Sequence, residues 1–212
     1  MSKSAARRSA LAMLGALIVA AALLSGCGGG GGGKATPRLD AAGEVQSTRP
    51  APEISLRNWD GRPVRLARLR GRAVLLTFIY DHCPDTCPLI VSKLRQALVE
   101  LGPKAAQAQV VAVSVDPRGD TPKTVRKFLV AHQMLGRMDY LIGSRRQLAP
   151  VWRAYGIDVG GSPEERENRE GSGVAHTALV YGIAGSGRER ALYDPLFKPS
   201  QVSHDVPLLA SM

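Results

Sequence analysis

The stretch that decides the fold is residues 73–88, which read AVLLTFIYDHCPDTCP. Its first eight residues are almost continuously apolar and partly β-branched, which is typical of a central strand buried on both faces. Directly after this strand come two cysteines, Cys83 and Cys87. Apolar residues then recur at helical spacing up to Leu101, where a Gly-Pro pair ends the pattern. The sequence therefore predicts a buried strand, a cysteine motif and a helix in immediate succession.

Two further strand and helix units follow this motif. Residues 110–115 form a second buried apolar run, and Thr121 is a predicted N-cap for a helix that reaches about residue 133. A short strand at 140–142 precedes a helix that Ser144 caps and that reaches Tyr155. Repeated βα units of this kind predict an α/β sheet.

Shorter strand signals lie at both ends of this region. Residues 54–64 contain an Asp-Gly turn between two short strand patterns, and residues 178–193 indicate a closing β-hairpin. Between the βα units and this hairpin, residues 158–173 are charged and rich in turn-forming residues, as in a long exposed loop. Residues 202–209 are only a weak candidate for a terminal helix because they include Pro207.

The N-terminus has the pattern of an export signal. Residues 1–26 begin with a basic stretch and continue with an apolar run that is too short to span a bilayer comfortably. The run ends in Leu-Ser-Gly before Cys27, which resembles the lipobox of bacterial lipoproteins, so we expect Cys27 to be lipidated. Residues 27–50 would then form the lipidated cysteine and a flexible glycine-rich tether, and 51–212 the folded domain. These features predict an exported lipoprotein on the periplasmic face of a bacterial membrane.

The charge balance is strongly basic. The formal net charge is +10, and +7 remains without the three cations of the signal. A basic balance is compatible with nucleic-acid binding, but an exported, lipid-anchored chain without a nucleic-acid motif favours anionic head groups or acidic partners. Solvated surface charge that serves solubility is an equally good interpretation.

The cysteine motif indicates a reactive or metal-binding site. Lipidation of Cys27 would leave Cys83 and Cys87 as the only thiols, and their spacing places them one helical turn apart. A helix N-terminus favours thiolate over thiol, and two thiolates suit Cu(I), Zn(II) or an iron–sulfur cluster. Two cysteines alone are too few for a structural zinc site or a cluster, so another ligand is expected. Four histidines are available, and spacing does not rank them: His82, His132, His176 and His204.

Several sequence blocks resemble the Sco/SenC family over essentially the whole predicted domain. They are Leu69-Arg70-Gly71, Thr77-Phe78-Ile79-Tyr80, Cys83-Pro84-Asp85-Thr86-Cys87-Pro88, Val113-Ser114-Val115-Asp116-Pro117 with Asp120-Thr121-Pro122, Val151-Trp152-Arg153-Ala154-Tyr155, and His176-Thr177-Ala178. Two positions depart from the family pattern. Ala175 stands where an acidic residue is usual, and Asp81 stands where a threonine is usual.

The resemblance implies a thioredoxin-like fold, with a central mixed β-sheet flanked by helices and an N-terminal β-hairpin. It also implies one copper ion held by Cys83, Cys87 and His176, as Cu(I) with Cu(II) as the alternative valence. The implied task is assembly of the copper centre of cytochrome c oxidase. The expected partner is a copper-receiving oxidase subunit or another periplasmic copper protein.

Two other functions compete with copper delivery. One is a thiol-disulfide oxidoreductase, in which Cys83 or Cys87 attacks a disulfide and the other cysteine resolves the mixed disulfide. The other is an inert structural disulfide in a domain that only docks a partner. Asp85, between the cysteines, is interpreted as a helix N-cap. Since exchange chemistry does not need His176 and ordinary thioredoxins have only two residues between their cysteines, the sequence favours a metal-delivery protein over an enzyme.

Overall fold

The structure is a computed structural model that describes residues 38–40, 43–44, 49–159 and 178–212. The predicted signal, Cys27, Ala175, His176 and most of the predicted 158–173 loop lie outside the described residues. Within the described part, no helix has the length and apolar character needed to cross a membrane.

In the described part of the chain, eight strands form one mixed sheet in the order β1-β8-β7-β4-β5-β6-β2-β3. Their bounds are Gly43–Glu44 (β1), Ser55–Asn58 (β2), Pro63–Arg65 (β3), Ala73–Ile79 (β4), Ala108–Ser114 (β5), Met138–Ile142 (β6), Val180–Ile183 (β7) and Glu189–Tyr193 (β8). Strand β5 is parallel to both β4 and β6, and the other neighbouring pairs are antiparallel. The predicted mixed sheet and the opening hairpin, β2 with β3, are confirmed.

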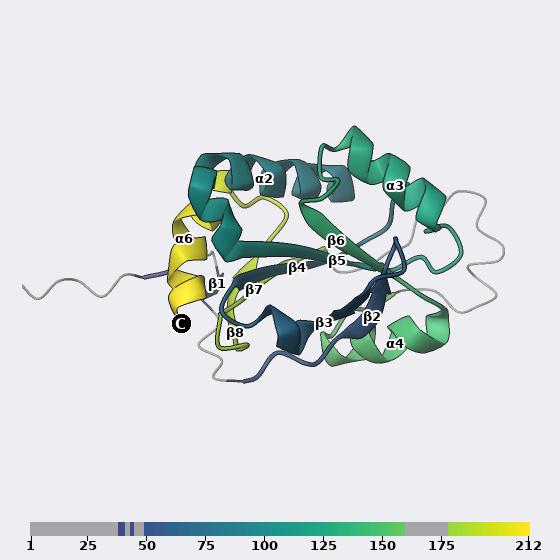
Figure 1. Cartoon of the computed structure of the whole chain (residues 1–212), viewed down its shortest axis with the longest axis horizontal. Coiled ribbons are helices and arrows are strands. Elements are labelled where there is room, and N and C mark those ends of the chain that lie inside the picture. Colours follow the sequence, from purple (N-terminus) through teal and green to yellow (C-terminus); the bar gives the residue numbers. More distant parts are fainter. Residues whose placement is uncertain (1–37, 41–42, 45–48, 160–177) are drawn as a thin grey trace, which may run out of the picture. The chain divides into compact units, whose positions relative to one another are not determined.

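Helices cover both faces of this sheet. They are the 3₁₀ turns η1 (Leu66–Leu69) and η2 (Gly102–Gln107) and the helices α2 (Thr86–Leu101), α3 (Pro122–Ala131), α4 (Arg145–Ala154) and α6 (Pro199–Ser211). Figure 1 shows α2 and α3 on one side of the sheet and α4 on the other. Helix α6 packs against α2 and β4. The order of elements confirms the predicted α/β architecture.

The local signals identified in the sequence form the elements expected of them. All seven residues of β4 are buried, as an unbroken apolar run predicts for a central strand. Thr121 accepts the Thr124 N–H in a capping box at the start of α3, and Ser144 occupies the N-cap of α4. Helix α2 begins at Thr86, directly after Asp85, the residue interpreted from the sequence as its N-cap.

Both ends of the domain are more extensive than the sequence suggests. Helix α6 continues through Pro207, whose missing N–H is offset by complete burial of Val202, Val206 and Leu209. At the other end, some of the residues assigned to the tether, among them Asp40, Gly43 and Glu44, contact the folded domain. Strand β1 pairs with β8, and the Asp40 N–H donates to the Asp205 carboxylate at 2.6 Å.

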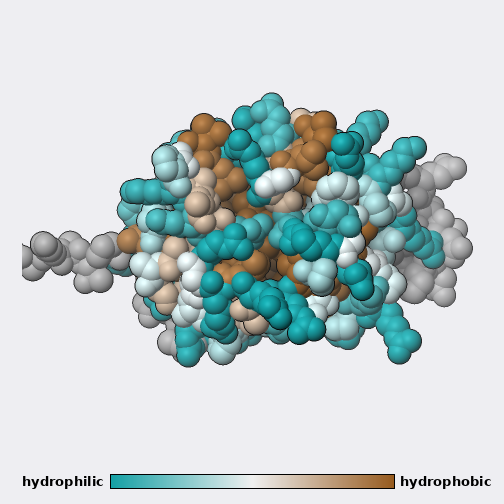
Figure 2. All heavy atoms as spheres, viewed as in Figure 1, coloured by the Kyte–Doolittle hydropathy of each residue, from teal (hydrophilic) through white to brown (hydrophobic). Residues whose placement is uncertain are grey.

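Hydrophilic side chains cover most of the surface seen in Figure 2, with apolar side chains exposed over α2 and α3. The exposed apolar residues include Leu89 and Val99 on α2 and Val130 on α3. Scattered positions of this kind are ordinary on a globular domain.

Candidate metal centre

Cys83 and Cys87 lie together where β4 passes into α2. Strand β4 ends at Ile79, and the Cys83 N–H donates to the Tyr80 carbonyl at 3.4 Å. The Asp85 carboxylate then caps α2 by accepting the Thr86 N–H, as predicted. Within the first turn, the Cys87 N–H donates to Cys83 Sγ at 3.4 Å. The two cysteines are unbonded thiols that lie close together, with Cys83 in the loop before α2 and Cys87 in its first turn.

The two thiols differ in exposure, and burial changes the acidity of Cys87. Cys83 is partly exposed, whereas Cys87 is completely buried. Burial, followed by its hydrogen bond with Cys83, raises the pKa of the Cys87 thiol well above its ordinary value. The expectation that the helix N-terminus favours the thiolate of both cysteines is therefore wrong for Cys87. There the loss of hydration outweighs the hydrogen bond with the Tyr80 backbone, which lowers the pKa, and the Cys87 N–H points to the other sulfur.

The third predicted ligand, His176, lies outside the described residues and stays a prediction. The described residues that follow it enter the sheet beside the carboxyl end of β4, after which the cysteines lie. Val180, the first residue of β7, pairs with Thr77 near the end of β4, and the Thr77 hydroxyl donates to the Leu179 carbonyl at 3.0 Å. Of the other histidines, His204 lies on α6 and His132 follows α3.

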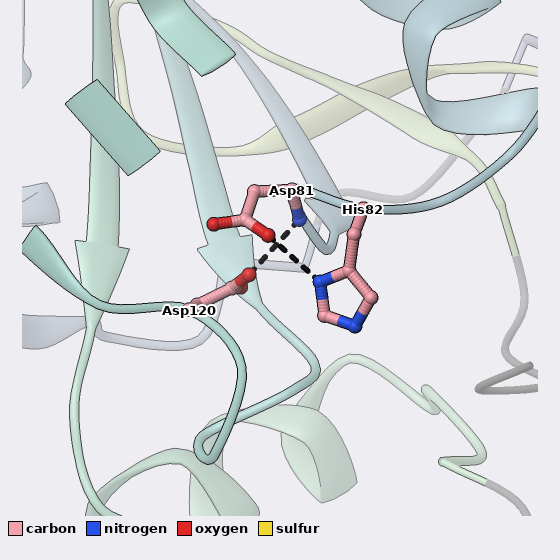
Figure 3. A group of neighbouring side chains, drawn as sticks. All are labelled: Asp81, His82 and Asp120. Atoms are coloured by element: carbon pink, nitrogen blue, oxygen red, sulfur yellow. Dashed lines mark hydrogen bonds and ion pairs between the residues drawn. The ribbon is translucent and has the colours of Figure 1, made fainter. Parts of the chain in front are cut away.

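A second group of polar side chains surrounds His82, next to Cys83. His82 Nδ1 lies 2.7 Å from Asp81 Oδ1, and Nε2 lies 3.2 Å from Asp116 Oδ2. The Asp81 N–H donates to Asp120 Oδ1 at 2.9 Å, which joins the turn after β4 to the turn after β5 (Figure 3). The sequence left His82 unranked among the four histidines and did not connect it with these carboxylates.

Asp120 is the most enclosed member of this group. Its carboxyl is buried, and its Oδ2 accepts the hydroxyl of the fully buried Tyr140 at 2.9 Å. Burial raises the pKa of Asp120 to about 7, although the Ser114 hydroxyl, the Asp81 N–H and the Tyr140 hydroxyl all favour the charged form. Loss of hydration thus outweighs these hydrogen bonds.

A mixed sheet with a cysteine pair at the junction of a central parallel strand and its helix defines a thioredoxin-like thiol protein. The solution structure of apo Sco1 from Thermus thermophilus matches with a TM-score of 0.68 and 29% identity, covering 82% of this chain and 99% of that one. The copper-bound structure of Bradyrhizobium japonicum ScoI matches with a TM-score of 0.66 and 26% identity, covering 76% of this chain and 99% of that one. The thioredoxin-like fold is thereby confirmed.

The SCO1/SenC family model matches residues 44–210, and the chain belongs to this family. Among its relatives is the mitochondrial protein SCO2 homolog of Bos taurus, 29% identical over 156 residues. That match covers 73% of this chain and 57% of the cattle protein. The chain therefore spans little more than half the length of this mitochondrial relative.

Proposed function

We propose that the protein is a copper metallochaperone that holds one copper ion through Cys83, Cys87 and His176. The observation that carries the proposal is the convergence of two thiols at the β4 to α2 junction, in a chain that resembles a copper-bound Sco structure. Copper is the cargo of such a protein. Its proposed destination is the copper centre of cytochrome c oxidase, with an oxidase subunit or another periplasmic copper protein as the receiver.

The donor chemistry supports Cu(I) as the main cargo. Thiolates are soft ligands that favour Cu(I), and an imidazole is compatible with both copper valences. Because the pKa of Cys87 is raised, its thiol must release a proton when it binds metal. Copper affinity should therefore increase with pH, and a partner that reprotonates the site would favour release.

The position of β7 supports His176 as the third ligand. Leu179 is fixed beside Thr77, two residues before the end of β4. Three residues of extended chain span at most about 10 Å. The chain that precedes Leu179 therefore enters the sheet near the end of β4, after which Cys83 follows, and this supports His176 as the third ligand.

Membrane attachment is the second part of the proposal. The signal pattern of residues 1–26 and the lipobox at Cys27 support an exported lipoprotein held at the periplasmic face of a bacterial membrane. Each buried lipid CH₂ contributes about 0.8 kcal/mol, so two or more acyl chains would anchor the protein stably. Metabolic labelling with a palmitate analogue tests this part, because Cys27→Ser should abolish the label.

A Cu(I) titration tests the metal site. The full chain in detergent is reduced anaerobically, and Cu(I) is added against a competing chelator. We expect one tightly bound copper per chain, and a much weaker site in His176→Ala. The control is His204→Ala, which removes an imidazole from α6. Copper bound no better than by a generic dithiol, with no effect of His176→Ala, would contradict the proposal.

The unequal exposure of the cysteines favours thiol-disulfide exchange as a second candidate function. Cys83, which is partly exposed, would attack a target disulfide as the thiolate and release one target thiolate. Cys87, which is buried, would then displace the second target sulfur, lose its proton and form the Cys83–Cys87 disulfide. Two electrons thus pass to the target, which gains two thiols. Reduction of a target disulfide that survives His176→Ala but not Cys83→Ser would support this function.

A further inference from the structure

The group around His82 has a feature that hydrogen bonding within the protein leaves unexplained. The Asp81 side chain is only 6% exposed, and its Oδ2 has no hydrogen-bond partner among the described residues. A buried carboxylate oxygen without a donor is costly in free energy. A cation bound by both oxygens of this carboxylate would remove that cost.

Three potential ligands converge at this point. One ligand atom from each of Asp81, His82 and Asp120 lies within 4.8 Å of the other two. Figure 3 shows the two carboxylates and the Nδ1 edge of the imidazole turned toward one another. The arrangement depends on the parallel pairing of β4 with β5, since Asp81 follows the end of one strand and Asp120 follows the end of the other.

The local charge also favours a cation. Asp81, Asp116 and Asp120 gather around a single imidazole, and within the described ranges the ion pairs of Asp81 and Asp116 are made with His82 alone. No lysine or arginine of the described part forms an ion pair with Asp120. Three carboxyl groups thus surround one imidazole, and this arrangement favours a bound cation.

The ligand atoms indicate which metal ion the group would bind. One imidazole nitrogen with carboxylate oxygens suits a divalent transition metal, and Cu(II) binds such ligands most tightly among the first-row divalent ions. Two ligands at about 2.0 Å and a right angle are about 2.8 Å apart. The distance of 2.7 Å between His82 Nδ1 and Asp81 Oδ1 is close to this value, so copper could replace the shared proton with little movement.

We propose that Asp81, His82 and Asp120 form a second metal site, which binds Cu(II), beside the thiol pair. Hard donors at this site and soft donors at Cys83 and Cys87 would separate the two valences of copper. A role in collecting oxidised copper for the thiols rests on the proposed function, but the site itself does not require His176.

The test uses the full chain in detergent with Cys83→Ser, Cys87→Ser and His176→Ala. These changes remove the proposed copper site, and they also remove a dithiol that would reduce two Cu(II) ions while forming a disulfide and releasing two protons. Cu(II) is titrated against glycine as a competitor, and the bound ion is examined by electron paramagnetic resonance. We expect one Cu(II) per chain with a nitrogen signal from one imidazole.

Single changes then identify the ligands. Added to this background, His82→Gln should abolish the imidazole signal and weaken Cu(II) binding by roughly 10-fold or more, and Asp81→Asn should weaken it by a similar factor. The matched control is His204→Gln, because the His204 imidazole also lies beside two carboxylates, those of Asp205 at 2.9 Å and Asp40 at 3.6 Å. This control should leave binding unchanged.

Unaltered Cu(II) binding in His82→Gln, or its loss in His204→Gln, would overturn the proposal. Should the background variant fail to fold, the same titration is made on the His176→Ala chain after its thiols are oxidised with diamide. The outcome is separable from that of the Cu(I) titration. If the Cu(I) titration fails while Cu(II) still binds at His82, only the proposed function is rejected. If Cu(I) binds as expected but Cu(II) does not bind at His82, only the second site is rejected.

Discussion

Tyr140→Phe should show that the buried hydrogen bond to Asp120 stabilises the fold. Tyr140 is completely buried, and its hydroxyl donates to Asp120 Oδ2 at 2.9 Å. A hydrogen bond to a charged group contributes about 1.5–3 kcal/mol, and water cannot readily replace the lost donor at a buried position. We therefore expect the free energy of unfolding of the metal-free protein to fall by about that amount at pH 8.5. The corresponding fall in Tm is roughly 3–12 °C.

The cost of Tyr140→Phe should depend on pH. Burial raises the pKa of Asp120 to about 7, so between about pH 4 and pH 7 the folded protein keeps a proton that the unfolded chain releases. This group therefore lowers stability as pH increases through that window. At pH 5 the carboxyl is protonated in the folded protein, and its hydrogen bond with Tyr140 is a neutral one worth about 1 kcal/mol. The variant should accordingly lose less stability at pH 5 than at pH 8.5.

Urea denaturation at both pH values, with EDTA present, measures this difference. The matched control is Tyr155→Phe, whose hydroxyl donates to the uncharged Pro52 carbonyl at 2.7 Å. Its cost should be about 0.5–1.5 kcal/mol and equal at both pH values. A cost of Tyr140→Phe that is equal at the two pH values, or larger at pH 5, would refute the assignment of a raised pKa to Asp120.

Three further outcomes are expected. Iodoacetamide should modify the partly exposed Cys83 well before the buried Cys87, which peptide mass spectrometry would detect; equal rates would contradict the burial of Cys87. His204→Gln should cost at most about 1 kcal/mol at pH 5.5, because the imidazole is exposed, and less at pH 8.5. The hydrogen bond to Asp205 raises the pKa of His204, so its contribution is complete below the unfolded pKa and lost as pH rises through the folded pKa; a larger cost at pH 8.5 would speak against this. Thr121→Ala should lower the free energy of unfolding by about 1 kcal/mol through loss of the capping box. An unchanged urea midpoint would show that the cap does not stabilise the fold.

The parts of the fold that sequence predicts well are those with local causes. A parallel strand buried on both faces needs an unbroken apolar run, and β4 has one. A capping residue bonds to the next turn of its own helix, so Asp85 and Thr121 are recognisable from their immediate neighbours. By contrast, Pro207 weakened the prediction of α6 because the compensating burial against α2 is a tertiary effect.

The site could be predicted only in part for the same reason. A separation of four residues is short enough to bring Cys83, in the loop before α2, next to Cys87, in its first turn. The contact between Asp81 and Asp120 joins residues 39 positions apart and exists only because β4 and β5 pair in parallel. The sequence signal that could have predicted this contact is that each of two successive buried strands, β4 and β5, is followed by an aspartate, Asp81 or Asp120. The raised pKa of Cys87 depends on how deeply the sheet and helices enclose it, and no local pattern reports that depth.

The two outermost strands of the sheet restrict how another protein can bind. Strand β1 has two residues, and β3 has three and begins with Pro63, which has no N–H to donate. Short edges of this kind offer few free backbone groups to an incoming strand. A partner protein is therefore not expected to extend the sheet, and recognition should depend on side chains around the end of β4. Specificity for a receiver would then be encoded in a few loop residues, which can change without altering the framework that holds the thiols.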